Sequence, residues 1–271
     1  AALEQYRAAY DTANYSTSYA EIRKQTIEDI FIWIPIVIIA ICVGVSILSK
    51  KIAKINIRAA TSGEKITFGK ELLFGFHVMS HPFDGFWDLK HEKRGSVRAA
   101  IVYLVVTILA FYYQAIGQGY LFNPQGEYST IFAQVVGVLM PVMLFVIANW
   151  CLTTLFEGEG SFRDIFVATC YALVPLPLFI IPATIASNVV TASEMDIVNL
   201  VISLAFIWAG FLIVFGVQVT HDYSLGKNII TIIGSIVGMV FIMFIALLFT
   251  TLLGKIVGFI SNIFIEIGYR L

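Results

Sequence analysis

The sequence is poor in charged residues, and this shortage excludes an ordinary soluble domain. Only 13% of the 271 residues are charged, whereas soluble domains carry about 25%. Apolar and aromatic residues make up 59%, and most of them lie in runs of about 20 residues, the length that crosses a bilayer core. The sequence therefore predicts an all-α integral membrane protein.

Cysteine is also scarce, and catalytic motifs are missing. Cys42, Cys151 and Cys170 lie in separate apolar runs, a pattern that predicts neither a disulfide framework nor a set of metal ligands. The net charge of -1 gives no basic excess for nucleic acid. Residues 158–161 read Gly-Glu-Gly-Ser but lack the strand-to-helix setting of a nucleophile elbow. We expect no catalytic site, no cofactor and no enzymatic activity.

The long apolar runs predict six transmembrane helices. The first covers residues 31–49 and is followed at once by Lys50, Lys51 and Lys54. The other five are expected at about residues 98–116, 131–155, 165–187, 197–218 and 228–253. Residues 1–30 are polar and predict a helical segment that packs on a partner, alone or as the end of a larger domain.

The distribution of Lys and Arg predicts how these helices cross the cell membrane. Ten of the 17 lie between Lys50 and Arg98, and two more fall in the other loops on that side, whereas residues 117–130 and 188–196 contain none. Because cations are retained in the cytoplasm, residues 50–97 are predicted to be cytoplasmic. Threading the chain from there places both termini outside.

Residues 254–271 predict a separate C-terminal helix. Lys255, Asn262, Glu266 and Arg270 recur on one helical face, opposite an apolar face, which is typical of a helix that lies in the membrane interface. An extension of the preceding transmembrane helix is the alternative.

Residues 68–97 predict a cytoplasmic amphipathic elbow. Apolar residues recur at helical spacing before Pro82, which should end the helix, and Phe86, Trp87 and Leu89 then supply a second apolar wedge beside several cations. The elbow either docks a partner protein or only fixes the next transmembrane helix at the lipid headgroups. The candidate docking residues are His81, Pro82, Phe83, Asp84, Phe86, Trp87, Lys90, Lys93 and Arg94.

The elbow histidines also suggest a metal site, but the spacing does not support one. His77 and His81 stand four residues apart, with Asp84, Asp88 and His91 following. Pro82 interrupts the shared helical face and no cysteine joins the set. We therefore expect no metal here.

Few polar residues fall within the predicted transmembrane helices. None near the middle of a span is ionisable, which argues against ion-coupled transport. The remaining amides either line a path for a neutral solute or form hydrogen bonds between helices. The candidates are Gln114, Asn149, Asn199 and Gln218.

Four short motifs in order resemble one known family. They are His-Pro-Phe-Asp-Gly-Phe-Trp at 81–87, Asn-Trp at 149–150, Gly-x-Gly-Ser-Phe at 158–162 and Tyr-Ala-Leu-Val-Pro at 171–175. Together they resemble the bacterial branch of the Yip family of five-span membrane proteins, over roughly residues 70–255. The resemblance implies a five-helix Yip-like domain over 98–253 and no enzymatic activity, and it leaves the N-terminal transmembrane anchor at 31–49 outside the family domain.

The resemblance also suggests partners. Eukaryotic members are associated with Rab GTPases and vesicle traffic, and bacterial relatives often occur beside carbohydrate importers of the ATP-binding cassette (ABC) type. The permease subunits of an ABC importer are therefore candidate partners, besides the lipid bilayer. Three functions remain open: a non-catalytic accessory or scaffold subunit of a membrane complex, a permease or channel for a small neutral solute, and a membrane-shaping or trafficking adaptor.

Overall fold

The computed structural model describes residues 2–30 and 67–270, and this part of the chain is built from helices. The predicted first transmembrane helix at 31–49 and the basic linker that follows it lie outside the described residues. The elements are α1 (Ala2–Ala8), α2 (Thr12–Ile30), α4 (Phe68–Ser80), α5 (Pro82–His91), α6 (Val97–Gly117), α7 (Ile131–Thr153), α8 (Phe162–Ala172), α9 (Pro175–Ala186), η1 (Ala192–Glu194), α10 (Met195–His221) and α11 (Leu225–Arg270).

Five helical segments of the described chain are long and apolar enough to cross a membrane. They match the last five predicted transmembrane helices in order and, except at the end of α11, within a few residues. The segments are Val97–Gly117, Ile131–Thr153, Phe162–Ala186, Ala192–His221 and Leu225–Glu266.

The third of these segments forms the centre of the bundle and consists of two helices, α8 and α9. The regular helix stops at Ala172 and resumes at Pro175, because proline supplies no N–H to the preceding turn. The Tyr171 side chain is fully buried beside this break. The prolines therefore interrupt the helix where neighbouring helices surround it, as a spanning segment requires.

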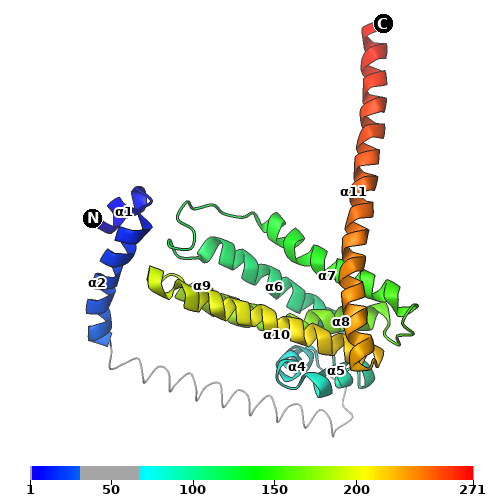
Figure 1. Cartoon of the computed structure of the whole chain (residues 1–271), viewed down its shortest axis with the longest axis horizontal. Coiled ribbons are helices and arrows are strands. Elements are labelled where there is room, and N and C mark those ends of the chain that lie inside the picture. Colours follow the sequence, from blue (N-terminus) through cyan, green and yellow to red (C-terminus); the bar gives the residue numbers. More distant parts are fainter. Residues whose placement is uncertain (1, 31–66, 271) are drawn as a thin grey trace.

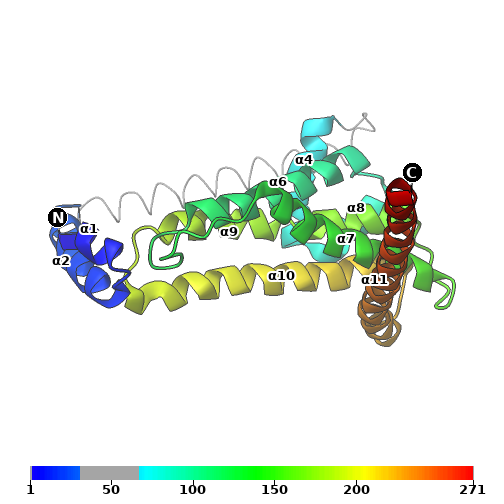
Figure 2. The same ribbon diagram turned by 90° about the horizontal axis from the view of Figure 1, so that it is seen from above.

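Helices α6, α7 and α10 pack around this centre largely through small side chains. Ala99 and Ala100 of α6 and Ala205 and Ala209 of α10 are all buried in one core cluster. Small residues let helix backbones approach closely in lipid, where the hydrophobic effect does not drive helices together. Figures 1 and 2 show α6, α9 and α10 running side by side along the long axis of the bundle.

The elbow lies at one end of the bundle, and its helix break is where the sequence predicts it. Helix α4 ends at Ser80 and α5 begins at Pro82. The Tyr103 hydroxyl of α6 donates to the Leu72 carbonyl, and the Tyr171 hydroxyl of α8 donates to the Glu71 carbonyl at 3.0 Å. Two tyrosines from the bundle therefore fix the first turns of α4.

One detail of the predicted apolar wedge is wrong. Phe86 and Leu89 of α5 do not face outward but belong to the core cluster, and Gly216 of α10 lets the Phe86 ring approach closely. Trp87 alone of the three remains exposed. An apolar side chain on this helix can pack against the bundle or against lipid, and helical spacing alone does not show which of the two it does.

The N-terminal helices α1 and α2 pack against the opposite end of the bundle (Figure 1). Arg23 of α2 donates to both carboxylate oxygens of Glu194, at 2.5 and 2.9 Å. The Ser16 hydroxyl accepts from the Ala192 N–H at 2.8 Å, and the Tyr15 ring lies 4.5 Å from that of Tyr120. The polar segment predicted to pack on a partner thus contacts the chain's own loops.

Helix α11 crosses the bundle beside the elbow and projects away from it (Figure 1). Gly234 and Gly238 face Leu152 and Ala148 of α7, whereas the later turns are exposed. The predicted separate helix at 254–271 is not a separate element, because α11 continues to Arg270. No proline interrupts this stretch, and each of its three glycines, Gly254, Gly258 and Gly268, costs a helix only about 1 kcal/mol.

Candidate functional site

The elbow and the cations Lys70, Lys90, Lys93, Arg94, Arg163 and Lys227 lie at one end of the bundle, here called the basic end. It comprises α4, α5, the loop 154–161 and the turn 222–224. The predicted docking residues all lie here, but they divide into an outward-facing set and a set that faces α8 and α10.

The outward-facing set forms the outer face of α5, defined by Phe83, Asp84, Trp87 and His91. Phe83 and Trp87 are each 49% exposed. Both rings are held in place, since Phe83 lies 4.6 Å from the Phe215 ring and Trp87 stacks on His91 at 4.7 Å between centroids. The outer face of α5 therefore presents two aromatic rings in fixed positions beside an exposed carboxylate.

Arg94, also predicted to dock a partner, is turned inward and occupied. Its side chain is 11% exposed and pairs with Asp88 at 3.0 Å and with Glu92. Burial raises the pKa of Asp88, while the Arg94 charge opposes that shift. Arg94 thus joins the end of α5 to the following turn and is not available to an outside ligand.

His77 and His81 stack on each other, with ring centroids 5.0 Å apart. Burial is the main reason that the pKa of His77 is lowered, and the charges of His81 and Arg94 add to the effect. In residues 2–30 and 67–270, no group of three His, Cys, Asp or Glu side chains is arranged to hold a metal ion.

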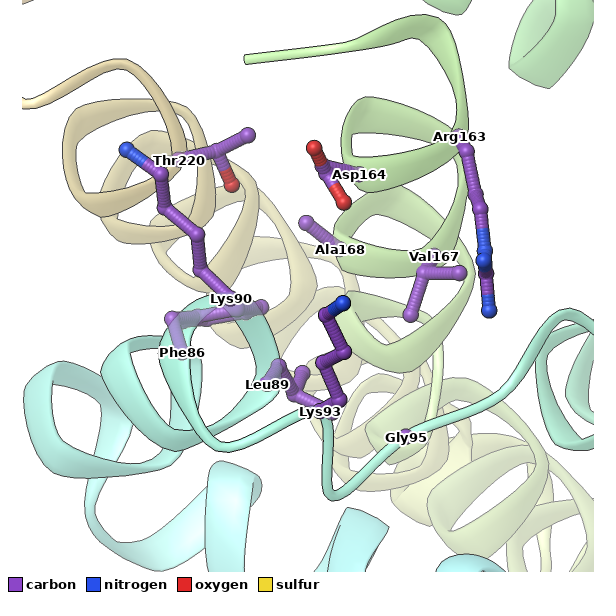
Figure 3. Close-up of a pocket in the computed structure, with 10 residues that line it drawn as sticks. All are labelled: Phe86, Leu89, Lys90, Lys93, Gly95, Arg163, Asp164, Val167, Ala168 and Thr220. Carbon is purple, nitrogen blue, oxygen red and sulfur yellow. The ribbon is translucent and has the colours of Figure 1, made fainter. Parts of the chain in front are cut away.

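A small pocket, here called the elbow pocket, opens between α5 and the start of α8 (Figure 3). Its volume is about 50 Å³. Leu89, Val167 and Ala168 give it an apolar wall, and charged side chains stand around the opening. The ten lining residues are Phe86, Leu89, Lys90, Lys93, Gly95, Arg163, Asp164, Val167, Ala168 and Thr220.

The loop 154–161 forms one side of the basic end. Lys90 of α5 donates to Glu159 at 3.0 Å, and this bond lowers the pKa of the exposed Glu159 carboxyl. Ser161 caps α8 in a reciprocal capping box with Asp164. The chain turns at 154–157, and Gly-Glu-Gly-Ser at 158–161 is the loop that leads to the N-cap residue Ser161.

The predicted polar residues of the transmembrane helices do not share one cavity. Asn149 is buried, and the space beside it admits no water molecule. Asn199 is exposed on the surface of α10, while Gln114 and Gln218 are half-buried on α6 and α10.

Sequence reasoning missed His221, which completes a buried polar cluster with Asn149. The His221 Nδ1 accepts from the Gly160 N–H at 3.2 Å, so Nε2 carries the hydrogen and donates to the Asn149 carbonyl oxygen at 2.8 Å. The Asn149 amide in turn donates to Ser235 at 3.0 Å. His221 is followed by Asp-Tyr-Ser in the sequence, which is typical of an exposed loop. For this reason the sequence did not indicate a buried role for His221.

A wider groove of about 450 Å³ runs between α4, α6 and α9. Its lining is almost wholly apolar and includes Leu72, Phe76 and Pro177. The described part of the chain shows nothing that covers it.

Comparison with known proteins agrees with this architecture. The profile of the Yip1 domain matches residues 76–264, which is more than half of the chain. This range begins in α4 of the elbow, includes the first four candidate spanning segments and covers the fifth up to residue 264. No curated protein and no solved structure gives a significant match. The chain belongs to the Yip1 domain family of membrane proteins.

Proposed function

We propose that this chain is a non-catalytic accessory subunit of a larger membrane complex and that a partner protein docks on the outer face of α5. The main support is that Phe83 and Trp87 are exposed on helix α5, whose other side is packed in the core. Aromatic residues dominate the binding energy of protein interfaces. Rings already held by Phe215 and His91 lose little conformational freedom on binding.

The basic end also suits a cytoplasmic partner. Residues 50–97 hold most of the cations, and this favours placing the elbow on the cytoplasmic side. Membrane subunits such as the permease subunits of an ABC importer are candidate partners, since they offer cytoplasmic loops at the same level.

Co-purification in a gentle detergent tests this function. We expect the wild-type chain to retain one or more membrane proteins that mass spectrometry can identify, and the double variant Phe83→Ala, Trp87→Ala to lose the same proteins. Phe132→Ala is the matched control, because Phe132 is equally apolar, 74% exposed and at the opposite end of the bundle. A wild-type chain that purifies alone and monodisperse would contradict the proposal.

A permease has less support in the described bundle. Asn149 is locked in hydrogen bonds with no room for water beside it, and Asn199 faces outward. Uptake by vesicles that contain the purified chain would distinguish the two functions, since a subunit without a path of its own gives no flux above empty vesicles.

A further inference from the structure

We infer that the elbow pocket is a binding site for a phosphate group. The two cations that would hold it, Lys93 and Arg163, come from opposite walls of the pocket and lie on either side of Val167 (Figure 3). Both are exposed, and neither makes an ion pair or hydrogen bond within the part of the chain that the structure describes. Two cations without an ion-pair partner at one small opening favour an anion.

The neighbouring charges are arranged so that these two cations stay free. Arg94 is held by Asp88 and Glu92, and Lys90 is held by Glu159. The backbone of Lys93 has a φ of 50°, a left-handed conformation that is uncommon for any residue but glycine. This turn directs Lys93 toward α8 (Figure 3), while Arg94 pairs with Asp88 of α5.

The size of the pocket limits what can enter. A volume of about 50 Å³ is smaller than the roughly 300 Å³ at which pockets for drug-sized ligands begin. A nucleotide or sugar would not fit inside, whereas a single phosphate group could reach both cations from the opening. The apolar wall of Leu89, Val167 and Ala168 suits the less polar part of a ligand beside the phosphate.

The position of the pocket suits a phosphate carried by a lipid. Arg163 lies in the first turn of one candidate spanning segment, and Thr220 lies at the end of another. Apolar helices end at the level of the lipid headgroups, where Lys and Arg meet anionic phosphates. Phosphate in solution offers the same chemistry, so the test must separate the two sources.

Asp164 is the one carboxylate in the pocket, and its role is local. It accepts hydrogen bonds from the Ser161 N–H at 3.2 Å and hydroxyl at 2.6 Å. Together with the Asp164 N–H that donates to the Ser161 hydroxyl at 3.3 Å, these bonds form the capping box of α8. The Asp164 carboxylate is therefore engaged at its own helix end, and the side-chain cations supply the attraction for phosphate.

The experiment uses the purified full chain in a neutral detergent. Thermal unfolding is followed while phosphatidylglycerol, phosphatidylcholine or inorganic phosphate at constant ionic strength is added, and native mass spectrometry counts the lipids retained. Stabilisation by phosphatidylglycerol alone identifies a lipid phosphate, and stabilisation by inorganic phosphate as well identifies a general phosphate site. No stabilisation by either anion overturns the inference.

Charge-neutral variants show whether the elbow pocket is responsible. Each lost cation should weaken binding by about fivefold, and the double variant Lys93→Gln, Arg163→Gln by roughly 30-fold. Lys24→Gln is the control, because Lys24 is an exposed cation near the opposite end of the bundle. Equal binding by the double variant and the control would also overturn the inference.

A third variant moves binding in the other direction. Asp164→Asn removes the negative charge from the pocket and should tighten phosphate binding even where weaker capping lowers the stability of the chain. The double variant with arginine and lysine exchanged, Lys93→Arg with Arg163→Lys, should bind as the wild type does. Weaker binding by Asp164→Asn would contradict an electrostatic site.

Discussion

At the residue scale, the polar side chains of the spanning helices divide into those that join helices and those that face outward. Asn149 and Asn199 are the same residue type in similar apolar surroundings of the sequence. In the structure Asn149 links α7 to His221 and Ser235, while Asn199 lies on the outer surface of α10. Substitutions at the two asparagines can therefore be compared directly.

We expect Asn149→Leu to destabilise the bundle by about 1 to 2 kcal/mol, because it leaves the buried Nε2 of His221 without an acceptor and removes the hydrogen bond to Ser235. Asn199→Leu should change stability little. Unfolding by titration with a denaturing detergent measures both variants. Equal stability of the two would show that the buried cluster contributes nothing.

The lowered pKa of His77 predicts how the stability of the chain depends on pH. Its pKa in the folded chain lies below the ordinary 6.5, mainly because of burial. The unfolded chain therefore binds more protons as the pH falls through 6.5, so acidification favours unfolding. The thermal midpoint of the chain should decrease from pH 7.5 to pH 5.5 in part through this group.

The variant His77→Gln should flatten that pH dependence, and His91→Gln, an exposed histidine on α5, is the matched control. The same slope in the wild type and in His77→Gln would exclude His77 as the source.

At the scale of the helices, glycine sets how closely the two arms of the elbow approach. A Cβ atom at Gly85 of α5 would lie 2.7 Å from the Cα of Val78 in α4. That atom belongs to the backbone and cannot rotate away. The close packing of α4 against α5 therefore depends on the absence of a side chain at Gly85.

Gly85→Ala should cost about 1 to 3 kcal/mol through overpacking, despite the roughly 1 kcal/mol that alanine adds to helix stability. Gly69→Ala is the control, since an added Cβ there meets nothing within 4 Å. Thermal unfolding of both variants gives the comparison, and an unchanged midpoint for Gly85→Ala would contradict the close packing of the elbow.

At the scale of the whole molecule, polar contacts attach the N-terminal helices to one end of the bundle and the elbow to the other. The N-terminal attachment depends on Arg23. Both of its terminal guanidinium nitrogens donate to Glu194, and one of them also donates to the Val189 carbonyl at 3.0 Å. Such a pair at a partly exposed site contributes at most about 1 kcal/mol. It orients α2 and adds little to global stability.

Arg23→Ala should therefore increase hydrogen exchange of α1 and α2 while leaving α6 to α10 protected. Arg23→Lys should rescue only part of the protection, because lysine lacks the planar fork. Lys24→Ala, next in the sequence and exposed, is the control. Unchanged exchange in Arg23→Ala would show that other contacts hold this end.

Composition and periodicity determine the class of this protein and most of its helices. Runs of about 20 apolar residues predict the five described spanning segments because the bilayer demands that length and hydrogen-bonded helices. Pro82 marks the predicted break correctly, and the structure adds a second break before Pro175, since the loss of an N–H acts locally. The ordered motifs from His81 to Pro175 are enough to indicate the family.

Tertiary structure alone determines which side of each helix meets protein, lipid or water. Phe86 and Trp87 are neighbours in the sequence, yet one is buried against Gly216 and the other is exposed. His221 contacts Asn149 across 72 residues, and Lys93 and Arg163 line the same elbow pocket. These pairings depend on how helices distant in the sequence pack together, and a pattern within one helix carries no information about its neighbour.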